Sequence, residues 1–212
     1  RPDGYSYLAW NENVKETLNT FGKLHITTLD PNFKKVGQDI VLDEYEIRQI
    51  LAIDKKHIYL IVGERKNNTF TEWYKYDYLE ANVLHFLKLD KRGNILTKTT
   101  LLGDKGQGPG AIWADNGFGV RYETKLAFNG EYFALYTGIR RNFAKTRGKD
   151  DVHEGDLFML IDRKGKVVEN KTQRWYSSHA FYMKMAINKQ GEFLTTNVGD
   201  SYPVGLIVRN RS

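Results

Sequence analysis

Apolar residues along this chain fall into short runs, and turn-forming residues separate the runs at regular intervals. The stretch "EGDLFMLIDRKGKVVE" at 154–169 holds an apolar run, then Asp-x-x-Gly, then a second run rich in Lys and Val. "NVLHFLKLDKRGNILT" at 82–97 repeats this order, and "KLHITTLDPNFKKVGQ" at 23–38 follows it more loosely. Asp at the start of a tight turn accepts backbone hydrogen bonds, and Gly at its end has no steric cost. We therefore predict a strand, a turn and a second strand in each stretch.

A second turn signal follows each of these stretches. It lies at Asp54, at Asn129-Gly130 and at 188–191, and Asn-Gly between apolar strands is the strongest short hairpin signal. Because the two signals alternate along the chain, we predict three repeats of four strands each. The predicted strands are 24–29, 34–42, 47–53 and 57–62, then 83–89, 94–102, 121–128 and 131–137, then 156–161, 166–172, 180–187 and 192–198.

Consecutive four-stranded meanders are typical of the blades of a β-propeller. We therefore predict an all-β fold, in which 1–212 is a single segment of a partial β-propeller with antiparallel blades at about 24–63, 83–138 and 156–199. The apolar first strand of each blade suits a buried position. The expected core residues are Ile26, Phe86, Leu87, Phe158 and Leu160.

Three blades are too few to close a ring, because a propeller normally needs roughly four to eight. An open fan of blades would leave apolar faces in water. "YSYLAW" at 5–10 and "VGLIVRN" at 204–210 are interpreted as strands that belong to neighbouring blades. We therefore expect the propeller to be completed from outside this sequence, by another protein chain or by further blades.

The composition narrows the class of protein only slightly. Lys and Arg outnumber Asp and Glu by 32 to 26, and this modest excess indicates a solvated basic surface rather than nucleic-acid binding. The absence of cysteine excludes disulfides and thiolate chemistry, and no apolar run approaches the roughly 18 residues of a membrane span. Sequons at Asn67, Asn170 and Asn210 permit secretion, and we expect an extracellular location.

The third repeat carries motifs that the other repeats lack. They are "HEGD" at 153–156, "WYSSHAF" at 175–181 and "GDSYPVG" at 199–205. Together they resemble a pattern of large, mostly uncharacterised β-propeller-like proteins, in which a His-x-Gly-Asp strand is followed by Trp, Ser-His-Ser and Asp-x-Tyr-Pro. Here Ser-His-Ala replaces Ser-His-Ser. The resemblance implies the same fold and implies no catalytic activity.

Two of the histidines follow the repeat. His25 and His85 each lie five residues before a turn Asp, so they are interpreted as parts of the repeat architecture. His57 follows a turn and is expected in solvent.

His153 and His179 have no counterpart in the other repeats. Asp156 and Asp200 lie near them in the same repeat, and an imidazole with a carboxylate can ligate zinc or another divalent metal, or act as a general base. A hydrogen-bonded brace between blades is the favoured interpretation of these residues. The metal site is kept as the alternative.

Three connections are candidates for ligand binding. Residues 66–83 concentrate aromatic side chains, which suit a partner surface or sugar stacking, or packing against the missing blades. Residues 103–120 begin glycine-rich but lack the spacing of a phosphate-binding loop, and 139–156 is basic. The candidate ligand-binding residues are Trp73, Tyr74, Tyr76, Trp113, Arg121, Arg140, Arg141 and Trp175.

We therefore expect a non-catalytic binding or assembly module that recognises a protein or a glycan through its loops, without a cofactor. The first alternative is an enzyme or metal-dependent lectin that uses the His153, Asp156, His179 and Asp200 set with a divalent metal. The second is nucleic-acid binding through the basic loop at 140–149, which is the less favoured partner class and would weaken with salt.

Overall fold

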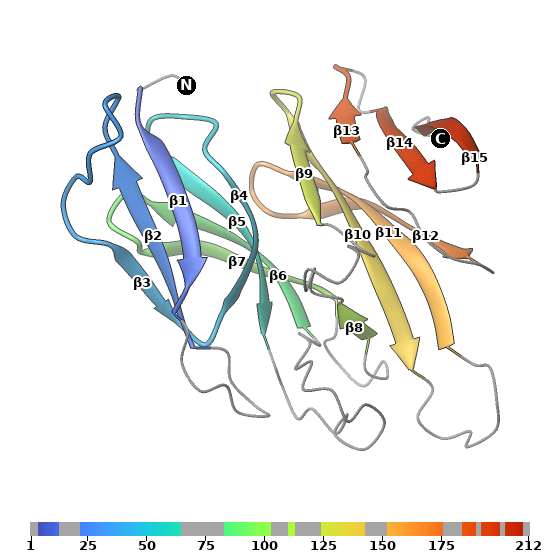
Figure 1. Ribbon diagram of the computed structural model, residues 1–212, viewed down its shortest axis with the longest axis horizontal. Coiled ribbons are helices and arrows are strands. Elements are labelled where there is room, and N and C mark those ends of the chain that lie inside the picture. Colours follow the sequence, from blue (N-terminus) through green and yellow to red (C-terminus); the bar gives the residue numbers. More distant parts are fainter. Residues whose placement is uncertain are drawn as a thin grey trace. The chain divides into compact units, whose positions relative to one another are not determined.

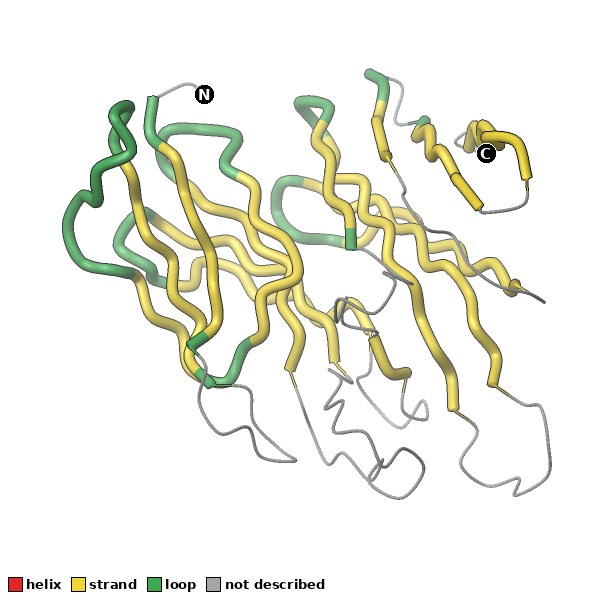
Figure 2. Tube along the Cα trace, viewed as in Figure 1, coloured by secondary structure: helices red, strands yellow, loops and turns green. Residues whose placement is uncertain are grey.

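The computed structural model describes residues 4–12, 22–64, 83–102, 110–112, 124–142, 152–175, 184–189, 192–199 and 202–209, where every regular element is a β-strand (Figure 2). The strands are β1 (Ser6–Asn11), β2 (Lys23–Leu29), β3 (Ile40–Asp43), β4 (Glu46–Leu51), β5 (His57–Glu64), β6 (Val83–Asp90), β7 (Ile95–Leu102), β8 (Gly110–Ile112), β9 (Lys125–Phe128), β10 (Tyr132–Asn142), β11 (Val152–Asp162), β12 (Val167–Trp175), β13 (Lys184–Ile187), β14 (Phe193–Gly199) and β15 (Tyr202–Arg209). The predicted all-β class is confirmed.

The described strands form four antiparallel sheets (Figure 1). The first sheet has the order β1-β2-β3, and the second has the order β4-β5-β6-β7. In the third sheet β12, β11 and β10 follow one another, and both β8 and β9 pair with the far edge of β10. The fourth sheet has the order β13-β14-β15. The chain divides into two compact units, Arg1–Lys105 and Gly106–Ser212, and each unit holds two of the sheets.

The turns at Asp30, Asp90 and Asp162 form as predicted. In each, one carboxylate oxygen accepts hydrogen bonds of 2.8–2.9 Å from the backbone N–H groups two and four residues later. The fourth turn position is left-handed in all three copies, and Gly93 and Gly165 occupy it with φ of 92° and 89°. Phe33 occupies it in the first copy, with φ of 62°. The Asp-x-x-Gly signal therefore located these hairpins correctly, even where the glycine is replaced.

The sheets group the strands differently from the predicted blades at 24–63, 83–138 and 156–199. Strands β5 and β6 pair along their length across the first predicted boundary, and β10 and β11 pair across the second. Turn signals identify hairpins with short turns, but an interior strand of a meander also pairs with its other neighbour. The sequence pattern thus indicated the spacing of the turns, but it did not indicate at which strand each sheet begins.

Two predicted loops are also shorter than expected. Residues 110–112, within the loop predicted at 103–120, form β8 and pair with β10. Half of the connection predicted at 139–156 is strand, because β10 continues to Asn142 and β11 begins at Val152. The third sheet therefore gains an extended hairpin from residues that the sequence assigned to a linker between blades.

One hydrophobic core joins the two sheets of the first unit. Its buried side chains are Leu24, Ile26 and Leu42 from the first sheet and Ile58, Leu60, Val62, Leu87 and Leu89 from the second. All five residues predicted to be core are buried, with at most 2% of their surface exposed. Their burial confirms that the apolar strands lie inside.

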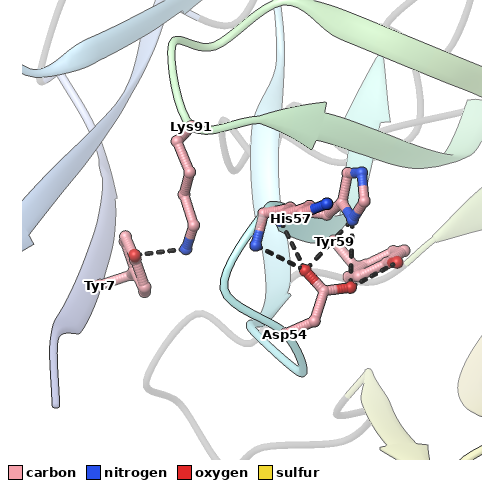
Figure 3. A network of polar contacts seen from close by, with 6 residues as sticks. Tyr7, Asp54, His57, Tyr59 and Lys91 are labelled. Atoms are coloured by element: carbon pink, nitrogen blue, oxygen red, sulfur yellow. Dashed lines mark hydrogen bonds and ion pairs between the residues drawn. The ribbon is translucent and has the colours of Figure 1, made fainter. Parts of the chain in front are cut away.

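Two polar contacts connect the same sheets. The Lys91 ammonium donates to the Tyr7 hydroxyl and lies 4.1 Å from the centroid of its ring (Figure 3). The Asn11 side chain donates to the Tyr45 carbonyl at 2.6 Å and accepts from the Ile47 N–H at 2.9 Å. The first sheet is thus held on the second by specific contacts as well as by apolar packing.

The strand registers define corresponding positions in the sheets. His25 lies opposite Trp10 in the first sheet, and His85 lies opposite Val62 in the second. Strand β1 therefore corresponds to β5, β2 to β6 and β3 to β7. The turn at Asp162 extends the same correspondence to β10, β11 and β12 of the third sheet.

Each sheet has two faces, which we name face A and face B. In the first sheet, face A holds Tyr7, Ala9, Leu24 and Ile26, and face B holds Leu8, Trp10, His25 and Val41. Face B of the second sheet holds the corresponding residues Leu60, Val62, His85 and Thr100. The core of the first unit is the packing of face A of the first sheet on face B of the second.

Candidate functional site on the first sheet

Face B of the first sheet leaves large apolar side chains in solvent. Leu8 and Trp10 on β1 are 54% and 40% exposed, and Val41 on β3 is 45% exposed. An apolar sheet face is normally covered by a further layer of structure, and an exposed one marks a contact surface. This face is the candidate functional site of the part of the chain that the structure describes.

The corresponding face is buried in the two other sheets that repeat it. Leu60 and Val62, the counterparts of the two exposed β1 residues, are both 0% exposed. Their counterparts in the third sheet, Leu135 and Thr137, are also 0% exposed. The same strand position therefore lies in a packed interior twice and in solvent once.

A histidine lies in the middle of this face. The His25 ring stacks on the Trp10 indole, with centroids 4.3 Å apart and ring planes 9° from parallel. Its Nε2 lies 3.7 Å from Glu12 Oε2 and its Nδ1 lies 3.9 Å from Asp39 Oδ2, and both distances are too long for hydrogen bonds. His25 Nε2 is shielded from solvent and has no hydrogen-bond partner among the described residues. The site is therefore an apolar surface with an imidazole between two carboxylates.

The second sheet shows a closed form of this arrangement. His85 is 1% exposed, its Nε2 lies 2.5 Å from Glu64 Oε2, and its Nδ1 lies 3.1 Å from Thr100 Oγ1. Glu64 corresponds to Glu12, because each lies two residues after the β-strand residue that opposes the histidine. His85 and Glu64 are within hydrogen-bond distance on the covered face of the second sheet. His25 and Glu12 are farther apart on the exposed face of the first sheet.

A lysine, 37% exposed, contacts this group from the edge of the second sheet. Lys98 Nζ donates to the Tyr45 hydroxyl at 2.8 Å and lies 3.4 Å from Glu64 Oε2. Burial alone would lower the pKa of Lys98, but the hydrogen bond to Tyr45 and the negative charge of Glu64 raise it above its ordinary value. The lysine therefore stays charged and compensates the carboxylate. In the first sheet the printed pairing ends at Ile26 and Ile40, and the next residue beyond it is Asp39, which has the opposite charge to Lys98.

A second polar network lies at the turn before β5 (Figure 3). The Asp54 carboxylate accepts the backbone N–H groups of Lys56 and His57 at 2.8 Å each, and its oxygens lie 3.1 Å from His57 Nδ1. The Tyr59 hydroxyl donates to it at 3.4 Å. Burial alone would raise the pKa of Asp54, but the hydrogen bonds from the His57 ring and from the two backbone N–H groups lower it to about 2. His57 is thus engaged by a carboxylate, where the sequence predicted a solvated residue.

Replacing Asp54 with alanine is expected to cost about 1–2 kcal/mol of unfolding free energy at neutral pH, because the turn loses its hydrogen-bond acceptor. The folded-state pKa lies below the ordinary value of 3.8, so this contribution is complete above pH 3.8 and is lost as the pH falls through about 2. Urea unfolding at several pH values from 7 down to 2.5 measures it, and the difference from the unchanged chain should shrink over this range. Asp54→Asn is the matched control, since Asn129 already accepts the same two N–H groups at 2.8–2.9 Å in the third sheet.

Seven of the residues predicted as sites lie outside the described residues. They are Trp73, Tyr74, Tyr76, Trp113, Arg121, His179 and Asp200. The aromatic loop surface and half of the alternative metal set therefore stay predictions from the sequence.

The other predicted site residues lie on strands of the third sheet. Arg140 and Arg141 belong to β10, so they are strand residues rather than part of a basic loop. Arg141 lies opposite His153, and Glu154 lies between Arg140 and Trp175 in the neighbouring strands. His153 and Asp156 both belong to β11, where they lie opposite Arg141 and Gly138 of β10.

Within the described ranges, no group of three or more His, Cys, Asp or Glu side chains is arranged to hold a metal ion. None of the described elements is a helix long and apolar enough to span a membrane. No protein-family model matches the sequence, and no curated protein matches it. The site is therefore interpreted from its own residues.

The sequence pattern did not identify face B of the first sheet as a site. Leu8, Trp10 and Val41 lie in ordinary apolar strand runs, and nothing in the runs themselves separates an exposed copy from a buried one. The one indication in the sequence was the strand predicted at 5–10. It was assigned to a neighbouring blade, next to which an apolar sheet face was expected to be exposed.

Proposed function

We propose that this chain is a non-catalytic assembly module of the β-propeller kind, in which the meander sheets act as stacked blades and face B of the first sheet binds protein. The observation that carries the proposal is the exposure of Leu8, Trp10 and Val41 on a face that is buried in two equivalent sheets. Covering such a face removes apolar surface from water and is favourable.

The first unit contains an example of a protein surface that packs on a face B. Face A of the first sheet packs on face B of the second and presents an aromatic ring, Tyr7, among the aliphatic side chains of Ala9, Leu24 and Ile26. A partner with an apolar β-sheet face of this composition suits face B of the first sheet for the same reason. The proposed partner is therefore a protein that contributes a β-sheet.

The charges near the site favour protein over nucleic acid. Glu12 and Asp39 are the ionic neighbours of His25, and Asp39 is also paired with Lys35 at 2.9 Å. Lys23 and Asp43 lie opposite each other at one end of the face and are exposed, and its large exposed side chains, Leu8, Trp10 and Val41, are apolar. Nucleic acids are bound mainly by Lys and Arg that neutralise phosphates. The charged residues at face B are of both signs rather than a cluster of Lys and Arg, so its exposed apolar side chains favour a protein surface over a phosphate backbone.

A double variant, Trp10→Ser with Val41→Ser, tests this function. A tagged form of the chain is used to isolate partners from cells that express it, and recovered proteins are quantified by mass spectrometry. A partner that uses face B should be recovered at least about tenfold less by the double variant, because each buried apolar side chain contributes about 1.5–3 kcal/mol.

Ile95→Ser with Leu96→Ser is the control variant, since these β7 residues are 43% and 51% exposed on another sheet. The control should recover the same partner as the unchanged chain. Far-ultraviolet circular dichroism and the unfolding midpoint show whether each variant is folded. Equal recovery of every protein by all three folded forms would count against the proposal.

A further inference from the structure

The turn that follows Asp30 differs from its two counterparts at one position. The fourth turn position is left-handed in all three copies, and it is Gly93 in the second sheet and Gly165 in the third. In the first sheet it is Phe33, with φ of 62°. This conformation strains a residue with a bulky side chain, whereas glycine adopts it readily. The first turn therefore keeps an aromatic ring at a position where glycine would fold more easily.

The Phe33 ring does not repay this strain by packing. It is 75% exposed, more than any other large apolar side chain among the described residues. No other ring and no cation contacts it in the part of the chain that the structure describes. Val36, three residues later, is 42% exposed. Strained and exposed apolar residues of this kind mark contact surfaces.

Three turns lie at the same end of the first unit. The turn at 90–94 reaches the start of β1, where Lys91 donates to the Tyr7 hydroxyl (Figure 3). The start of β1 pairs with the end of β2, so the turn at 30–34 lies there as well. The turn at 54–56 precedes β5, whose first residue lies opposite the last residue of β6. We name these three turns together the turn end of the first unit.

The turn end carries positive charge that the described residues do not neutralise. Four exposed cations have no carboxylate partner among those residues, and they are Lys34, Lys55, Lys56 and Arg92. The aspartates that begin the three turns accept hydrogen bonds from backbone N–H groups of their own turns. Lys35, by contrast, is paired with Asp39 at 2.9 Å. The turn end thus presents an exposed aromatic ring together with free cations.

We propose that the turn end of the first unit binds the surface of an anionic lipid bilayer, with the Phe33 ring inserted among the headgroups. Apolar side chains gain free energy at the boundary between headgroups and acyl chains. Lys and Arg near the same surface are attracted by anionic headgroups. The proposal goes beyond the assembly function, because it uses none of the residues of face B.

A bilayer suits this surface better than a folded protein or a nucleic acid does. Phe33 projects from the tip of a turn, and a protein would need a matching concave pocket to bury one projecting ring. A bilayer interface accepts such a side chain at any point. Single-stranded nucleic acids stack their bases on aromatic rings, and the aliphatic Val36 beside Phe33 provides no stacking surface.

The test measures cosedimentation of the full chain with lipid vesicles. One set contains phosphatidylcholine alone, and the other contains equal parts of phosphatidylcholine and phosphatidylglycerol. The mixed vesicles should bind the chain at least about tenfold more tightly than the neutral ones, because only they attract the free cations. High salt should weaken binding to the mixed vesicles, because it screens exposed charges.

Phe33→Gly is the decisive variant. It should weaken binding to the mixed vesicles at least about tenfold, because the inserted aromatic side chain is lost. It should also raise the urea midpoint of unfolding, because glycine relieves the left-handed turn. Lost binding in this variant therefore cannot be attributed to a damaged fold.

Three further variants separate the contributions. Phe33→Ala removes the ring but not the strain, so it should weaken binding as much as Phe33→Gly without the rise in midpoint. Lys34→Gln should weaken binding about fivefold, because one cation is lost. Val168→Ser is the control, since Val168 is 41% exposed on β12 of the other unit. It should bind as the unchanged chain does.

Equal binding by the unchanged and Phe33→Gly chains would overturn the proposal. Absence of binding to the mixed vesicles, or equal binding to both kinds of vesicle, would overturn it as well. Binding to a single-stranded oligonucleotide but not to vesicles would identify nucleic acid as the ligand instead. The vesicle experiment contains no partner protein, so its failure leaves the assembly function of face B standing. Conversely, the variants that test face B keep Phe33, so a failed partner recovery leaves the turn end standing.

Discussion

Replacing Gly93 with alanine is expected to lower the free energy of unfolding by about 3 kcal/mol, through backbone strain and overpacking together. Gly93 has φ of 92°, a conformation that residues with a side chain rarely adopt. A Cβ atom at this position would lie 2.5 Å from Ile40 Cγ2 and 3.3 Å from its Cγ1. Ile40 is partly buried and packs against the hydrophobic core of the first unit. Urea unfolding of the full chain measures the effect.

Comparison with two other positions distinguishes the free-energy cost of backbone strain from that of the steric overlap with Ile40. Gly37 has φ of 70° with nothing within 4 Å of an added Cβ, so Gly37→Ala should cost only about 1 kcal/mol. Phe33 occupies the turn position that corresponds to Gly93, with φ of 62° and 75% of its surface exposed. A side chain is thus tolerated in this turn where space is open. Equal losses for Gly93→Ala and Gly37→Ala would show that the contact with Ile40 is unimportant.

The buried pair between Glu64 and His85 is expected to show strong coupling in a double-mutant cycle. Glu64→Ile should cost about 3 kcal/mol, because the His85 ring stays buried and loses the hydrogen-bond partner of its Nε2. His85 is 1% exposed and loses its 2.5 Å contact in that variant. His85→Leu should cost about 2 kcal/mol, because a buried acceptor loses its hydrogen-bond donor.

The double variant, Glu64→Ile with His85→Leu, should cost less than the sum of the two single changes. The third sheet has apolar residue types, Ile139 and Leu157, at the corresponding register positions. Replacing both members of a buried ionic pair with apolar residues is often neutral. Additive losses, measured by urea unfolding of all four forms, would contradict the coupling and would assign the stability to the individual side chains.

The turns were the part of the fold that the sequence predicted best. Asp30, Asp90 and Asp162 each satisfy the backbone of their own turn within four residues, so the information is local. Even Phe33 in place of glycine did not hide the first copy, because the Asp contributes the hydrogen bonds. Local chemistry of this kind can be recognised without knowing what the strands pack against.

The grouping of strands into sheets was not accessible in the same way. Each β-strand in a meander has two neighbours, and the same periodic sequence is compatible with a sheet that starts at β2 or at β4. The long connection between β5 and β6 carries no tight-turn signal, yet these strands pair from His57 to Glu64. The two are buried on both faces, and this burial, rather than any turn, makes them the centre of the second sheet.

By itself the sequence determined the all-β class, the hairpin turns and the apolar positions of the core, because each depends on side chains within a few residues of one another. Only the tertiary structure decided which strands share a sheet and which of three equivalent faces stays in solvent. These properties depend on what lies across a strand or above a sheet, and identical local patterns can have different neighbours in space. Leu8 and Leu60 are the clearest case, since equivalent leucines are exposed in one sheet and buried in the next.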